Sequence, residues 1–107
     1  MNETIKKILA ELTDKLYLYT PPGKTKPPYV TYGVDGNESL KADNRISSSK
    51  DQGCIDLYTL DANDELIKAI PKALDQHEIS FKLNSVQFEE TSLLHYEWRW
   101  ECGTDHY

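Results

Sequence analysis

The two cysteines are the side chains in this sequence that are most suited to redox or nucleophilic chemistry. Cys54 and Cys102 lie far apart in the chain, so they form neither a CxxC redox pair nor the paired spacing of a tetrahedral zinc site. Both fall in segments that we expect to be strands, where a cysteine packs as a small apolar residue. A Cys54–Cys102 disulfide between neighbouring strands and a nucleophilic thiol remain as alternatives.

The histidines and the adjacent carboxylates give no stronger signal. His77, His95 and His106 fall at an expected helix end, on the polar face of a strand and in the C-terminal tail, without metal-ligand spacing. Glu89 and Glu90 are adjacent, and adjacent strand residues point to opposite faces, so they cannot act together as an acid and base. Phosphate-binding glycine loops, nucleophile elbows and HExxH helices are absent from the sequence. We therefore predict a protein that is not an enzyme and has no cofactor or metal.

An aromatic stripe near the C-terminus is the remaining candidate for ligand binding. Tyr96, Trp98 and Trp100 alternate with charged residues in the clearest strand pattern of the chain. Such a stripe serves either as a platform for sugars or bases or as one side of a core. Because the alternation predicts one buried and one wet face, we favour the core and keep an interface as the alternative.

The elements that position these residues follow from apolar spacing. Helical periodicity predicts a first helix over residues 3–16, and an acidic start followed by an apolar stripe predicts a second one that ends near Gln76. Strand composition predicts a central strand over 54–60, and a shift of phase near Asn84–Ser85 predicts a β-bulge. The expected fold is one α+β domain over residues 1–107, with two helices packed on one face of a mainly antiparallel sheet in the order α-β-β-β-α-β-β.

Two long polar segments stand out in so short a chain. We expect residues 20–28, which carry four prolines, and residues 35–53 to be flexible loops, and residues 103–107 to be a frayed tail. Residues 45–52 have an alternative interpretation as the polar outer half of a long strand. Loops of this size commonly meet partners. The candidate protein-contact residues in these segments are Lys24, Lys26, Arg45, Lys50, Asp51 and Gln52.

Composition narrows the classes of partner. The chain has 107 residues and a formal net charge of −6, which opposes duplex binding through phosphate contacts. We therefore expect no sequence-specific nucleic-acid binding. The longest apolar runs are far shorter than the roughly 20 residues that cross a bilayer, and the first residues lack the apolar centre of a signal peptide. We expect no membrane association.

Two segments carry a family resemblance. The strand Cys54–Asp61 before the acidic Glu65, and the terminal hairpin from Phe81 through His95–Trp100, resemble the small tail-assembly proteins of long-tailed phages and prophages of Gram-positive bacteria, similar to the tail terminator (tail completion) family. The likeness extends through the opening helix and the proline-rich approach to Tyr29. It therefore covers most of the chain, although it includes no catalytic signature.

The resemblance implies a function without enzyme activity. It implies an α+β subunit that forms a ring, typically of six copies, which caps the tail tube and joins it to the head connector. The implied partners are other copies of the chain, the tail-tube protein and the head–tail connector protein. The implied location is the tail–head junction of the virion, with the bacterial host cytoplasm during assembly. The alternative hypothesis is a small monomeric adaptor or inhibitor that binds a host protein through its loops or a sheet edge.

Overall fold

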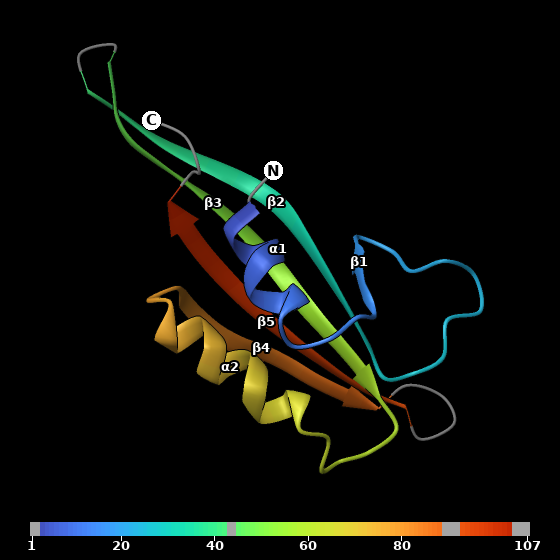
Figure 1. Cartoon of the computed structure of the whole chain (residues 1–107). Helices are drawn as coiled ribbons and strands as arrows, with labels where there is room; N and C mark the ends of the chain where they lie inside the picture. Colours follow the sequence, from blue (N-terminus) through green and yellow to red (C-terminus); the bar gives the residue numbers. More distant parts are fainter. Residues whose placement is uncertain (1–2, 43–44, 89–92, 104–107) are drawn as a thin grey trace.

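The computed structural model contains two helices and one five-stranded sheet (Figure 1). It describes residues 3–42, 45–88 and 93–103. The α+β class and the predicted order of elements are confirmed. The elements are α1 (Glu3–Ala10), β1 (Leu16–Leu18), β2 (Tyr29–Ala42), β3 (Arg45–Thr59), α2 (Leu66–Gln76), β4 (Ser80–Phe88) and β5 (Leu94–Gly103).

The sheet is mixed, with the spatial order β1-β2-β3-β5-β4. The short β1 runs parallel to β2, and the other three neighbouring pairs are antiparallel. β3 lies in the middle, as the apolar character of its second half predicts. The β-bulge is also confirmed, since the register of β4 against β5 shifts between Leu83 and Ser85.

One face of the sheet carries the core. Ile55 and Leu57 on β3 are fully buried, and their cross-strand neighbours include Val30 and Trp98. Figure 1 shows α1 crossing in front of the sheet and α2 running beside β4. The buried residues of both helices belong to the same cluster as those of the strands. These buried helix residues are Ile5, Ile8, Leu9, Ile70, Ala73 and Leu74.

The first helix is shorter than the sequence predicts. Apolar spacing indicates a helix over residues 3–16, but α1 ends at Ala10 and Leu16 begins β1. Leu16 pairs with Val30, and the carbonyl of Lys15 accepts a hydrogen bond from the Val30 amide. Sheet pairing therefore takes over residues whose spacing alone suits a further helical turn.

The polar segment 35–53 is not a loop, and that prediction is wrong. β2 extends to Ala42 and β3 begins at Arg45, so the two strands form one long antiparallel hairpin. The alternative, that residues 45–52 are the polar outer half of a strand, is confirmed. Apolar alternation does not mark these residues, and backbone pairing between β2 and β3 makes them strands.

The hairpin makes the molecule elongated. Its dimensions are 53 × 27 × 23 Å, and its radius of gyration is 15.0 Å, against about 13 Å for a compact domain of this length. Residues 19–28 contain no helix or strand, as predicted for the first polar segment. Gly103 belongs to β5, whereas the rest of the predicted tail and the pair Glu89–Glu90 lie outside the described residues.

Neither α1 nor α2 has the length and apolarity that a bilayer crossing requires; this holds for residues 3–42, 45–88 and 93–103.

Candidate functional site: the second face of the sheet

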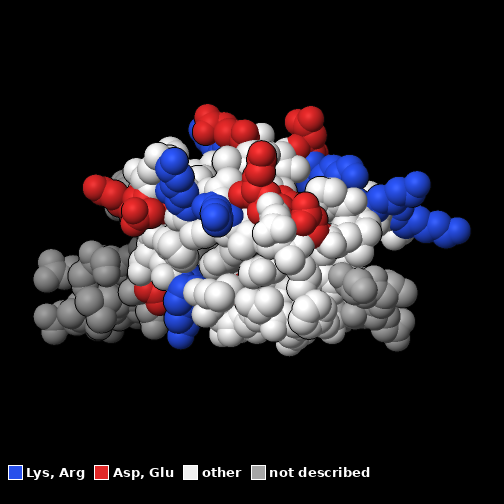
Figure 2. All heavy atoms as spheres, turned by 90° about the horizontal axis from the view of Figure 1, so that it is seen from below, with Lys and Arg blue, Asp and Glu red and all other residues white. Residues whose placement is uncertain are grey.

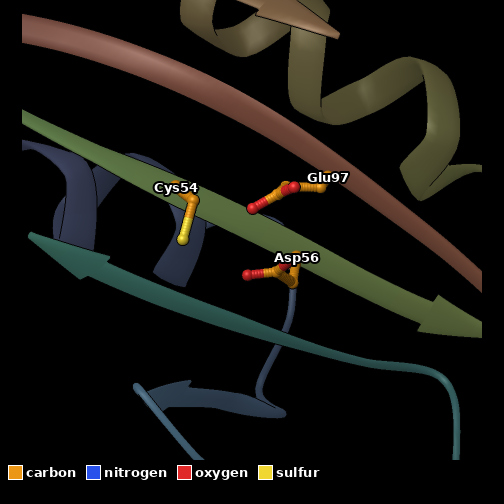
Figure 3. A group of neighbouring side chains, drawn as sticks. All are labelled: Cys54, Asp56 and Glu97. Atoms are coloured by element: carbon orange, nitrogen blue, oxygen red, sulfur yellow. The ribbon is translucent and has the colours of Figure 1, made fainter. Parts of the chain in front are cut away.

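The face of the sheet away from the core gathers the polar side chains of its central strands. Asp56 of β3 lies directly opposite Glu97 of β5, and Cys54 precedes Asp56 by two positions, so all three point the same way. Figure 3 shows these three side chains together on β3 and β5. The thiol sulfur and one oxygen of each carboxylate lie within 4.8 Å of one another.

Hydrogen bonds occupy both carboxylates. Asp56 Oδ1 lies 2.7 Å from Nε2 of His95, the residue two positions before Glu97. Glu97 Oε1 accepts hydrogen bonds from Asn84 Nδ2 at 2.8 Å and from Ser85 Oγ at 3.5 Å, both at the β4 bulge. The bulge therefore brings two β4 donors to the Glu97 carboxylate. Facing carboxylates repel each other, and these donors offset part of that repulsion.

The surroundings of Cys54 suppress thiol chemistry. Burial, followed by the charge of Asp56 and a hydrogen bond to it, raises the pKa of the Cys54 thiol to about 12. The thiolate, which is the nucleophile and the metal ligand, is therefore scarce at neutral pH. Sulfur and carboxylate are zinc ligand types, but both carboxylates already have donors and the thiol keeps its proton. Hydrogen bonding explains the cluster, so we assign no metal to it.

A row of aromatic rings crosses the same face. Tyr29, Tyr58 and His95 lie directly opposite one another on β2, β3 and β5. Their rings stack with centroids 4.8 Å and 4.2 Å apart, and Tyr17 of β1 meets Tyr29 edge-on at 6.5 Å. Because ring faces in this row cover one another, they are not available to stack on bases or sugars. The row therefore joins four strands and does not form a ligand platform.

An ion pair supports the base of the hairpin. Arg99 of β5 donates two hydrogen bonds to the Asp35 carboxylate of β2, at 2.5 and 2.9 Å. This hydrogen bonding raises the pKa of Arg99 further above its ordinary value. Arg99 also lines an open hollow of about 440 Å³ with Gln52, Lys82 and Glu101. The hollow is shallow and polar, and no catalytic set of side chains converges in it.

The predicted protein-contact residues divide between two regions. Lys24 and Lys26 are exposed in the loop before β2, and the carbonyl of Lys26 accepts a hydrogen bond from Lys15 Nζ at 3.0 Å. The other four lie along the first half of β3. These are Arg45, Lys50, Asp51 and Gln52.

The two regions do not form a single site, because the loop enters β2 at Tyr29, whereas Lys50 pairs with Glu38 far along the hairpin. Asp51 is only 8% exposed, which leaves its carboxylate little surface for a partner.

The other predicted chemical residues also stay apart. Cys54 and Cys102 lie on opposite faces of the sheet, so no disulfide joins them. Cys102 packs against the core as predicted, whereas Cys54 is half-buried on the polar face. His77 is the C-cap of α2, as its position in the sequence predicts. Trp98 and Trp100 are buried, which confirms the core interpretation of the aromatic stripe.

Sequence reasoning missed an exposed apolar row on β4. Leu83, Val86 and Phe88 are 52%, 46% and 80% exposed, although their strand positions match those of core residues. α2 has only eleven residues, and these three side chains are left uncovered. The sequence carries one signal for this exposed row, because β4 has more apolar residues than the eleven-residue α2 covers.

No protein-family model matches this chain, and no curated protein matches it.

Proposed function

We propose that this chain is a structural subunit of phage or prophage tail assembly, which forms a ring that caps the tail tube and joins it to the head connector. The observation that carries the proposal is the β2–β3 hairpin, which projects from the core and makes the molecule 53 Å long. A subunit that contacts neighbours on both sides needs a rigid core and projecting elements of this kind. The family resemblance of the sequence supports the same role.

In this proposal, both helices cover one face of the sheet, and contacts to neighbours use the remaining surface. In the view of Figure 2, charged side chains gather along the upper side, and a large part of the lower surface carries none. An interface needs a surface from which few charges must be desolvated.

The absence of a converging nucleophile and base among the described residues favours a structural role over catalysis. Cys54 keeps its proton, and Cys102 lies on the other face. A structural subunit needs neither a nucleophile nor a base. The net charge of −6 also suits a protein beside passing DNA, because the duplex does not adhere to an acidic surface.

Deletion of the gene in the genome that encodes it tests this function. We expect electron microscopy of the lysate to show filled heads and tails that are not joined. Supplying the chain in trans should restore joined particles. Normal particles from the deletion strain would refute the proposal. A defined one-to-one complex with a host protein, recovered from cells that make no tails, would favour the adaptor instead.

A further inference from the structure

Several strand edges lack a neighbouring strand among the described residues, and two of these edges match each other. One is the outer edge of β4, because β4 is the last strand of the sheet. The other is the outer edge of β2 over residues 35–42, which we call the distal β2 edge. β1 pairs with β2 only through Tyr32, and the Tyr19 hydroxyl donates to the carbonyl of Val34. A strand edge with unpaired amides and carbonyls is a template for another strand.

The geometry points to head-to-tail pairing between copies of this chain, in which the β4 edge of one copy adds to the distal β2 edge of the next. This inference rests on the proposed ring function and specifies its interface. The occupant of the β4 edge is thus a second copy of the same chain, bound by β-augmentation.

Strand direction supports this pairing. β2 is antiparallel to β3, β3 to β5 and β5 to β4, so β4 runs opposite to β2. Copies in a head-to-tail array keep nearly the same orientation as they repeat. β4 of one copy therefore meets β2 of the next in the antiparallel sense, which is the more stable arrangement.

Length and charge also match. β4 spans Ser80–Phe88, nine residues, and the distal β2 edge has eight. The single charged residue of β4 is Lys82, whereas residues 35–42 contain Asp35, Glu38 and Lys41. Asp35 is already paired with Arg99 of its own copy, so Glu38 is the charge of this segment that is opposite to Lys82. A symmetric β4–β4 pair instead brings two copies of Lys82 into the same interface, which opposes that pairing.

The exposed apolar row on β4 also favours the binding of a partner at this strand. Leu83, Val86 and Phe88 project from this strand on the core side of the sheet, and Phe88 is 80% exposed. Natural proteins protect edge strands with charges or prolines, and a contiguous apolar row marks an interaction surface. A strand added at the β4 edge brings its own side chains beside this row.

The first test weakens the β4 edge with a double substitution, Val86→Lys with Phe88→Lys. Both positions are exposed, so the core does not lose a buried group. The matched control is Leu60→Lys, which changes a residue that is 60% exposed and lies outside β4. Sedimentation velocity across concentration should show oligomers larger than dimers for the wild type. We expect association at least 100-fold weaker for the double variant and within 3-fold of wild type for the control.

The second test distinguishes head-to-tail from symmetric pairing. A trimmed variant replaces residues 38–50 by an Asn-Gly turn, which removes most of the distal β2 edge and keeps β4. We expect the trimmed variant and the double variant to be monomeric alone, and their equimolar mixture to form a heterodimer and nothing larger. Two-dimensional amide NMR spectra should show that each variant keeps the native fold.

Several outcomes would overturn the inference. A trimmed variant that dimerises alone would indicate β4–β4 pairing. Unchanged association of the double variant would exclude the β4 edge, and a wild type that stays monomeric at millimolar concentration would exclude self-pairing. If the double variant blocks association but the deletion strain makes normal particles, the interface stands and the proposed function fails. If deletion abolishes joining but both edge variants restore it, the function stands and the interface fails.

Discussion

The two faces of this sheet show two ways of holding the same strands together. On the core face, Ile55 and Leu57 are fully buried in the apolar cluster that also includes residues of both helices. On the second face, Asp56 and Tyr58 come from the same strand but remain half-buried, and each is held by a specific partner on β5. Burial is non-directional and scales with apolar area, whereas the polar face depends on geometry. The core face should therefore carry most of the stability.

The largest expected contrast concerns two glycines. A Cβ at Gly53 would collide with the Gly33 carbonyl oxygen and lie 2.7 Å from Trp100 Cζ2, so backbone must move. A Cβ at Gly33 would lie 2.6 Å from the ring of Tyr19, which is 56% exposed and can swing away. We expect Gly53→Ala to cost about 3 kcal/mol or more and Gly33→Ala about 1 kcal/mol, measured by urea unfolding. Equal costs would contradict this account of the close approach.

A second contrast uses adjacent residues of β3. Leu57→Ala removes a fully buried side chain, and we expect a loss of about 2–5 kcal/mol. Tyr58→Ala interrupts the aromatic row, whose cross-strand pairs are worth about 0.5–1.5 kcal/mol each. The free energy of unfolding from denaturant titration measures both. If Tyr58→Ala costs as much as Leu57→Ala, the second face contributes more than its burial indicates.

A smaller effect is expected at the Asp35–Arg99 ion pair. Both side chains are partly exposed, at 45% and 33%, so solvent screens the pair. We expect Arg99→Ala to lower the free energy of unfolding by about 1 kcal/mol or less. The difference from wild type should shrink in 1 M salt. Lys82→Ala, which removes another cation that lines the same hollow, is the control and should have a smaller effect.

The last effect concerns the proton on Cys54 and is seen only at alkaline pH. Its pKa is raised to about 12 by burial and by Asp56, so the folded state holds this proton more tightly than the unfolded state. The resulting stability is present below the unfolded pKa of about 9 and is lost as pH rises toward 12. In the Cys102→Ala background, thiolate absorbance should titrate near 12, and Asp56→Asn should move the midpoint downward. A midpoint near 9 would refute the assigned environment.

The sequence predicted the elements that are built by burial. The alternation from Leu94 to Cys102 marks a strand with one covered face, and the phase shift at Asn84–Ser85 marks the bulge. The prediction for residues 35–53 was wrong because this hairpin extends beyond the helices and carries no apolar pattern that indicates a strand. The cluster at Asp56 and Glu97 was also missed, because its members come together only through the β3–β5 register. β3 and β5 are separated in the chain by α2 and β4, so no hairpin turn sets their register.

The short strand β1 has a consequence for any sheet that continues through β2. Ser80 pairs with Glu101, Glu101 with Gln52, and Gln52 with Gly36, so the first residue of β4 lies level with Gly36 of β2. From there, β4 runs toward the level of Tyr29. β1 covers that part of β2, so an incoming β4 must slide roughly 20 Å toward the hairpin tip, about six residues at ~3.4 Å each. The strands β2, β3, β5 and β4 of one copy together span roughly 20 Å across the sheet, at about 4.8 Å for each strand. A displacement of the same size along the strands tilts them by roughly 45° from the axis of a closed ring, which is close to the tilt in a β-barrel. β1 would thus set the shear of the assembly.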